Sequence, residues 1–176
     1  MPELPEVEVV KLFLEQKLLN KTIFKLEILT PKSFIGNPEF VEGQKIIKFS
    51  RLGKQLSIYL SNNLILLIHL KMTGQLLYKS PLLKGDLEGL VMLGHPTSTF
   101  NSKSTRLIFT FDDKSKLYFN DQRKFGWIKL LNQAELAEAQ SGLGLDIFDP
   151  NFSSKYLYSQ LQKSRRPIKI LLLDQH

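Results

Sequence analysis

The spacing of apolar residues changes along this chain, and that change constrains the fold more than any other feature. Residues Pro5–Leu19 carry apolar side chains at helical spacing: Val7, Val10, Leu14 and Leu18. From about Lys45, short apolar runs separated by polar turns are typical of strands. After Asn132 the pattern is helical again. We therefore predict an α+β fold: an N-terminal β-sandwich flanked by the first helix, followed by a partial helical domain.

The expected elements divide the chain into two parts. Residues 79–104, rich in Gly, Pro, Ser and Thr, predict a long loop. Helices are expected at Ala134–Gln140, from an N-cap at Ser153 to about Gln162, and at 168–174 after Pro167. We assign residues 1–132 to the sandwich domain and 133–176 to the start of the helical domain. Strands are expected at 46–49, 56–59, 64–68, 75–78, 106–111, 116–119 and 127–131.

The composition narrows the class of protein. Lys and Arg number 24 against 17 Asp and Glu, a net charge of +7, which suits a polyanionic partner but also occurs in proteins that bind no nucleic acid. The absence of cysteine excludes disulfides and thiolate metal sites. The histidines His69, His95 and His176 lie far apart, so we expect no metal site. The N-terminus lacks a signal-peptide pattern and no apolar run spans a bilayer, so we expect a cytoplasmic protein with no membrane partner.

The N-terminal residues could carry covalent chemistry. A small second residue usually allows removal of Met1, which would leave Pro2 with a free secondary amine. An α-amino group has a pKa of about 8, so part of it is unprotonated and can attack a sugar carbon as lysine does in Schiff bases. Glu3 and Glu6 would share one helix face and could transfer protons. These residues are equally typical of an ordinary helix start, where acidic side chains favour the dipole.

Five segments together resemble the formamidopyrimidine-DNA glycosylase family, which also includes endonuclease VIII-type enzymes. They occur in the family's order and span the chain: Pro2–Glu8, Leu52–Lys54, His69–Gly74, Asn120–Gly126 and Arg166–Gln175.

The resemblance implies roles for four residues at the reacting sugar. Pro2 would displace the damaged base and hold the sugar as an iminium. Glu3 would protonate the opening ring, and Glu6 would support the site. Lys54 would lie near the flanking phosphate and assist strand scission by β-elimination, because an iminium acidifies the neighbouring sugar proton.

The resemblance also implies DNA-binding residues. Met72, Arg123 and Phe125 would fill the space left by an extruded base, and their joint presence favours the oxidised-purine branch. His69 resembles a phosphate-contacting residue, although a strand histidine with local hydrogen bonds explains it too. A basic cluster lies around a helix start and consists of Lys163, Arg165, Arg166 and Lys169. It is equally typical of a phosphate-binding site and of a solvent-exposed helix face.

The implied function is base-excision repair: a bifunctional glycosylase and abasic-site lyase for 8-oxoguanine and formamidopyrimidines, acting as a monomer on damaged double-stranded DNA. Three features depart from the family. Ser104 stands where the family has a histidine that contacts DNA, so a potential phosphate contact is lost. Gln122 replaces a proline, which would loosen the turn that aims Arg123. The sequence also contains no counterpart of the family's four-cysteine zinc finger, so no cofactor is expected in this chain. The alternatives are a non-catalytic damaged-DNA-binding protein and an inactive fragment.

Overall fold

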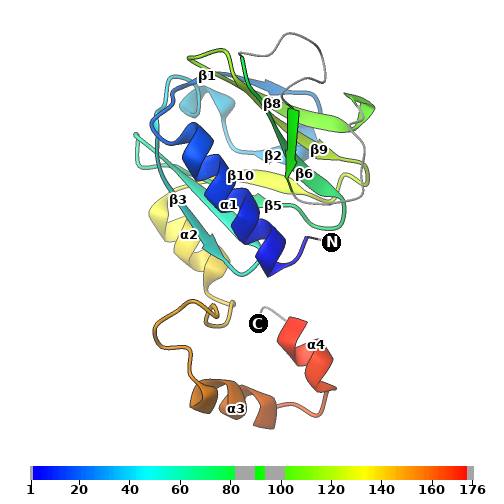
Figure 1. Cartoon of the computed structure of the whole chain (residues 1–176). Helices are drawn as coiled ribbons and strands as arrows, with labels where there is room; N and C mark the ends of the chain where they lie inside the picture. Colours follow the sequence, from blue (N-terminus) through cyan, green and yellow to red (C-terminus); the bar gives the residue numbers. More distant parts are fainter. Residues whose placement is uncertain (1, 82–89, 94–101, 174–176) are drawn as a thin grey trace.

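The computed structural model describes residues 2–81, 90–93 and 102–173, which form a β-sandwich with helices around and below it (Figure 1). One five-stranded sheet has the order β1-β8-β9-β6-β7, and the other has the order β2-β10-β5-β4-β3. All pairs are antiparallel except β2 with β10. The strands are β1 (Ile23–Ile28), β2 (Phe34–Ile35), β3 (Ile46–Leu52), β4 (Gln55–Leu60), β5 (Ile65–His69), β6 (Gly74–Lys79), β7 (Leu90–Leu93), β8 (Thr105–Phe111), β9 (Lys116–Asp121) and β10 (Trp127–Leu131).

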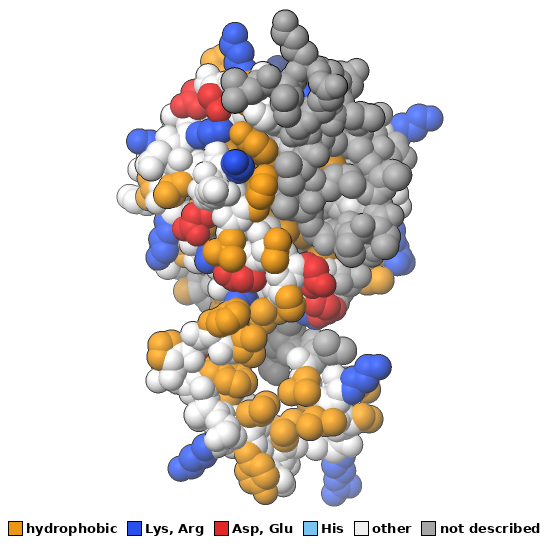
Figure 2. Space-filling view, viewed as in Figure 1, with side chains coloured by type: hydrophobic (Ala, Val, Ile, Leu, Met, Phe, Trp, Pro, Cys, Tyr) orange, Lys and Arg blue, Asp and Glu red, His pale blue; other side chains and the backbone are white. Residues whose placement is uncertain are grey.

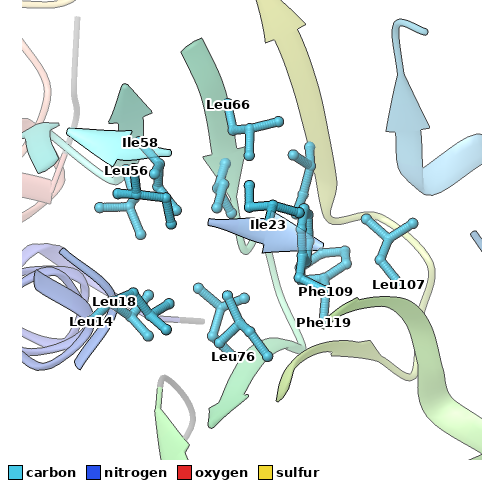
Figure 3. Close-up of a cluster of buried hydrophobic side chains, with 14 of the residues drawn as sticks. Leu14, Leu18, Ile23, Leu56, Ile58, Leu66, Leu76, Leu107, Phe109 and Phe119 are labelled. Carbon is cyan, nitrogen blue, oxygen red and sulfur yellow. The ribbon is translucent and has the colours of Figure 1, made fainter. Parts of the chain in front are cut away.

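The first helix, α1 (Leu4–Leu18), closes one side of the sandwich. Its Glu6 carboxylate accepts a hydrogen bond from the Glu3 backbone N–H at 2.9 Å, which satisfies a donor that a helix start leaves open. The helix contacts β3 and β7, the terminal strands of the two sheets. Figure 3 shows Leu14 and Leu18 beside side chains from both sheets, so one face of α1 belongs to the core.

The remaining helices lie toward the C-terminus. Helix α2 (Gln133–Gln140) begins at Asn132, whose side chain accepts from the Glu135 N–H, and it packs Leu136 onto β5. Helices α3 (Ser154–Gln162) and α4 (Ile168–Leu173) stand below the sandwich (Figure 1). Short 3₁₀ turns occupy Pro31–Ser33, Pro38–Phe40 and Ser102–Ser104. None of the helices in the described part of the chain is long and apolar enough to cross a membrane.

The α+β prediction with an N-terminal sandwich is confirmed. Each predicted strand is present, most of them slightly longer than expected, and Ser153 caps α3 by accepting from the Tyr156 N–H. The prediction of one long loop at 79–104 is wrong, because β7 and a 3₁₀ turn lie within it; residues 82–89 and 94–101 are outside the described residues. Asp174, the expected end of the last helix, is outside them too.

Strands β1 and β2 are not among the predicted strands, although Phe24, Leu26 and Ile28 alternate with charged residues. In β1 the register shifts between Ile23 and Lys25, so buried and exposed residues do not alternate along it, and Phe24 faces solvent. Strand β2 has only two residues, too few for any period to show.

Two leucines of α1 test how far the core depends on this helix. Leu14 is fully buried and Leu12 is mostly exposed on the same helix. We expect Leu14→Ala to lower the free energy of unfolding by about 2–5 kcal/mol, since it removes buried methyl groups and leaves a cavity. Leu12→Ala should change it by less than about 0.5 kcal/mol. Urea unfolding followed by circular dichroism measures both, and equal losses would show that α1 is not part of the core.

Candidate active site

A pocket of about 320 Å³ lies between the start of α1, the β3–β4 turn and the C-terminal segment. Most of its wall is apolar, and Figure 2 shows apolar side chains gathered on the C-terminal helices and where these meet the sandwich. The lining residues are Glu3, Leu4, Pro5, Gly53, Lys54, Leu143, Gly144, Leu145, Asp146, Ile147, Phe152, Tyr156, Leu157, Gln160, Leu171 and Leu172.

An ion pair between Glu3 and Lys54 lies in this pocket. The Lys54 Nζ is 2.6 Å from the Glu3 Oε2, with the two side chains 8% and 34% exposed. Lys54 sits in a tight turn between β3 and β4, where Gly53 has a φ of 55° that glycine adopts without steric penalty. The turn and the start of α1 thus bring together two residues that are distant in sequence.

Pro2 and Glu6 flank this pair. Pro2 is buried next to Glu3, just outside the residues that line the pocket. Glu6 holds the Glu3 backbone through the hydrogen bond at the helix start. Because the Glu6 carboxylate is engaged with the backbone, its geometry suits support of Glu3 rather than contact with a ligand.

An arginine that the sequence did not single out fixes the walls of the pocket. The Arg51 Nε is 2.6 Å from the Glu8 Oε2 on α1, and its Nη1 and Nη2 bind both carboxylate oxygens of Asp146, the second at 3.0 Å. The same Asp146 carboxylate accepts from the Gly53 N–H at 3.1 Å, and Arg51 donates to the Gly53 carbonyl at 3.0 Å. This Arg51 network therefore joins α1, the turn that carries Lys54, and the segment leading to α3.

The charged groups of the Arg51 network are largely buried, which is unfavourable unless they are paired. The side chains of Arg51 and Asp146 are only 3% and 9% exposed. Burial raises the pKa of Asp146, but hydrogen bonds from Arg51 and from the N–H groups of Phe148 and Gly53 outweigh it, so this pKa lies below its ordinary value. For Glu8, burial is likewise outweighed by Arg51 and Lys11, and its pKa is lowered. Both carboxylates are charged at neutral pH and compensate the guanidinium.

A weak sequence signal could have located this network. Asp146 is a lone charge within the apolar stretch 143–148, a pattern that indicates a buried and therefore paired carboxylate. Its partner could not be read from the sequence, because Arg51 lies on a distant strand.

His69 lies on the face of β5 that α2 covers rather than in the pocket lining. Strand pairing places it between Gln55 and Trp127, with its ring centroid 5.7 Å from that of Trp127. Its Nδ1 accepts from the Lys71 N–H at 3.1 Å, which leaves the ring proton on Nε2. Burial, reinforced by the charges of Lys71 and Lys54, lowers the pKa of His69 to about 4. His69 is thus a neutral hydrogen-bond donor at neutral pH.

The three residues expected to fill an extruded base's place lie together, away from the pocket lining. Met72 is on the loop between β5 and β6, and Arg123 and Phe125 are on the loop between β9 and β10. All three are exposed, and the Arg123 guanidinium carbon lies 5.1 Å from the centre of the Phe125 ring. The structure brings a flexible apolar side chain, an aromatic ring and a guanidinium to one end of the sandwich.

The basic residues of the C-terminal helices stand apart from these groups. Arg165 precedes α4 and Lys169 lies on it, and both are exposed to solvent. Within the described ranges, no group of three or more His, Cys, Asp or Glu side chains could hold a metal ion.

Solved structures with the same architecture contain DNA. The chain matches Lactococcus lactis Fpg in complex with DNA containing an abasic site, with a TM-score of 0.79 and 26% identity over 98% of this chain and 61% of that one. It also matches a variant of that protein in complex with Fapy-dG-containing DNA, with a TM-score of 0.80 and 26% identity over 99% of this chain and 60% of that one.

Residues 1–128 match the family model described as the formamidopyrimidine-DNA glycosylase N-terminal domain, and the chain belongs to this family. The formamidopyrimidine-DNA glycosylase of Ureaplasma parvum serovar 3 is 36% identical over 99% of this chain and 61% of its own length. The enzyme of the same name from Chloroflexus aurantiacus is 35% identical over 100% of this chain and 59% of its own length. The chain thus spans about 60% of the length of these relatives.

The lowered pKa of His69 predicts a pH-dependent stability. In the unfolded chain a histidine gains its proton below about pH 6.5, whereas folded His69 stays neutral down to about pH 4. Because the unfolded state then binds more protons, the stability present above about pH 6.5 is lost as the pH falls toward 4.

Substitution of His69 checks this window. His69→Asn keeps an acceptor for the Lys71 N–H but does not titrate, so its unfolding free energy should fall less than that of the wild type between about pH 6.5 and 5. Urea unfolding at a series of pH values measures the slope. Identical slopes for the two proteins would show that folded His69 takes up a proton as readily as the unfolded residue does.

Proposed function

We propose that this chain is the nucleophile-bearing part of a base-excision-repair DNA glycosylase that removes oxidised purines and then cleaves the strand. Residues 1–132 would be its catalytic domain, and 133–176 the start of its helical DNA-binding domain. The observation that carries the proposal is the Glu3–Lys54 ion pair at 2.6 Å, held in a pocket at the N-terminal end of a chain of this family.

The first chemical step requires a free amine at Pro2. While Met1 is attached, the Pro2 nitrogen is an amide and is not nucleophilic, so the proposal includes removal of Met1. The freed amine attacks C1′ of the damaged nucleotide, and the base leaves with the bonding electrons and takes up a proton. The amine then passes its own proton to the Glu3 carboxylate. Opening of the C1′–O4′ bond, with proton donation to O4′ from Glu3, gives the iminium.

The second step is β-elimination at the same sugar. The iminium draws electrons from C2′, a C2′ proton is lost, and the 3′ phosphate leaves with the C3′–O electrons. Lys54 would stabilise the leaving phosphate after it exchanges its partner Glu3 for that anion. Its burial and its place on a short turn support this role, since a fixed ammonium needs little reorganisation. Glu6 would keep the Glu3 backbone in place.

The protein would act as a monomer on duplex DNA. This DNA would contain an oxidised purine such as 8-oxoguanine or a formamidopyrimidine. Met72, Arg123 and Phe125 would enter the space of the extruded base, for which their exposure at one end of the sandwich is suited. His69, Arg165 and Lys169 would contact phosphates. The net charge of +7 favours this polyanion.

Borohydride trapping tests the proposed catalytic pair. Reduction of the iminium on a duplex containing 8-oxoguanine should give a covalent adduct. We expect Glu3→Gln to slow single-turnover trapping by about 10²–10⁴-fold, because it removes the proton donor. Glu15→Gln, on the same helix but outside the pocket lining, should trap at the wild-type rate. Peptide mass spectrometry should place the adduct on Pro2.

The other outcomes separate the rival functions. Tight binding of the lesion duplex without an adduct from the wild type would identify a damaged-DNA-binding protein. No binding, together with a non-cooperative unfolding transition, would identify an inactive fragment. An adduct on a lysine side chain would contradict the role of Pro2.

A further inference from the structure

Two loops cross between the sheets at the same end of the sandwich. One, residues 70–73, joins β5 to β6, and the other, residues 122–126, joins β9 to β10. Gly74 pairs with Asp121 in one sheet, and His69 pairs with Trp127 in the other. The strands on both sides of the loops are therefore paired, so the two loops lie side by side from start to finish.

One buried carboxylate binds both loops. Asp121 is fully buried at the end of β9. Its Oδ2 accepts from the Gly126 N–H at 2.7 Å, and its Oδ1 accepts from the Arg123 N–H at 3.1 Å. The same Oδ1 accepts a short hydrogen bond from the Thr73 hydroxyl of the other loop. The Thr73 oxygen in turn accepts from the Arg123 N–H at 3.1 Å, which gives a second bond between the loops.

Tight packing leaves these loops little freedom. A Cβ at Gly126 would lie 2.8 Å from the Phe119 Cζ and 3.2 Å from the Asp121 carboxylate, and one at Gly74 would lie 2.2 Å from the Leu70 carbonyl oxygen. Each loop also contains a lysine in the left-handed region, with φ of 53° at Lys71 and 59° at Lys124. Such backbone persists only where the surroundings fix it. The Asp121 carboxylate does so on both sides of Lys124, and His69 Nδ1 does so at the Lys71 N–H.

These hydrogen bonds lie next to Gln122, in the turn that carries Arg123. The replacement of a proline by Gln122 was expected to loosen the turn that aims Arg123. The backbone N–H of Arg123 instead binds Asp121 and Thr73, and Gly126 binds Asp121 at the far end. Side-chain hydrogen bonds from Asp121 and Thr73 thus hold the backbone that follows Gln122.

We propose that Thr73 and Asp121 are positioning residues that couple the two loops into one unit. The coupling would present Met72 from one loop and Arg123 and Phe125 from the other in a fixed relation. That these three side chains enter DNA rests on the proposed function; the coupling itself rests on the hydrogen bonds between the loops. Lesion removal from an intact duplex, which requires base extrusion, should depend on it more than reaction at an abasic site, where the base is already absent.

A matched pair of substitutions at Thr73 tests the coupling. Thr73→Val keeps the shape of the side chain but removes both bonds between the loops, whereas Thr73→Ser keeps the hydroxyl. In the Val variant the Arg123 and Gly126 amides should exchange hydrogen about tenfold faster than in the wild type, and in the Ser variant at near wild-type rates. Unchanged exchange in the Val variant would overturn the coupling. This measurement needs no DNA and no activity.

Borohydride trapping on two duplexes then tests what the coupling does. We expect Thr73→Val to slow single-turnover trapping about tenfold on an 8-oxoguanine duplex but less than about threefold on an abasic-site duplex, with Thr73→Ser restoring both rates. Equal slowing on the two duplexes would overturn the role in base extrusion. If the wild type traps neither duplex, the proposed function fails while hydrogen exchange still decides the coupling. The role in extrusion then stands only if Thr73→Val lowers 2-aminopurine fluorescence in a bound duplex.

Discussion

The arrangement of the pocket depends on one buried guanidinium. A buried charge is unfavourable unless it is paired and its hydrogen bonds are satisfied, and Arg51 meets this requirement with partners from three separate parts of the chain. Glu8 comes from α1, the Gly53 carbonyl from the β3–β4 turn, and Asp146 from the segment before α3. Because the hydrogen bonds of this one buried side chain reach all three parts, they hold these parts in one arrangement, and the pocket lies between them.

Two kinds of interaction thus position the candidate catalytic groups. Apolar burial fixes the axis of α1, since Leu14 and Leu18 lie in the core between the sheets. Directional hydrogen bonds then fix what apolar packing leaves open: Glu6 sets the start of the helix, and Asp146 sets the turn that carries Lys54. The same division appears at the other end of the sandwich, where the sheets bring two loops together and Asp121 sets their conformation.

Local signals in the sequence predicted the parts that depend on local physics. The helical spacing of Val7, Val10 and Leu14 and the cap at Ser153 identified real helices, and the segments around Glu3 and Lys54 identified the residues that meet in the pocket. Strand β1 is not among the predicted strands, although Phe24, Leu26 and Ile28 alternate with charged residues as is typical of a strand. The pairing of Arg51 with Asp146 could not be predicted from the sequence, because it joins positions 95 residues apart that only the folded chain brings together.

The distance between the sandwich and the C-terminal helices tests most directly whether Arg51 holds the pocket together. The sequence contains no cysteine, so spin labels can be attached at cysteines introduced for Leu12 and Tyr158, both of which are exposed. Pulsed electron paramagnetic resonance should give one narrow distance distribution in the labelled protein and in a matched Asp149→Ala control. With Asp146→Ala the distribution should broaden. An equally narrow and unshifted distribution with Asp146→Ala would contradict the account, because the helices would then keep their place without the ion pair.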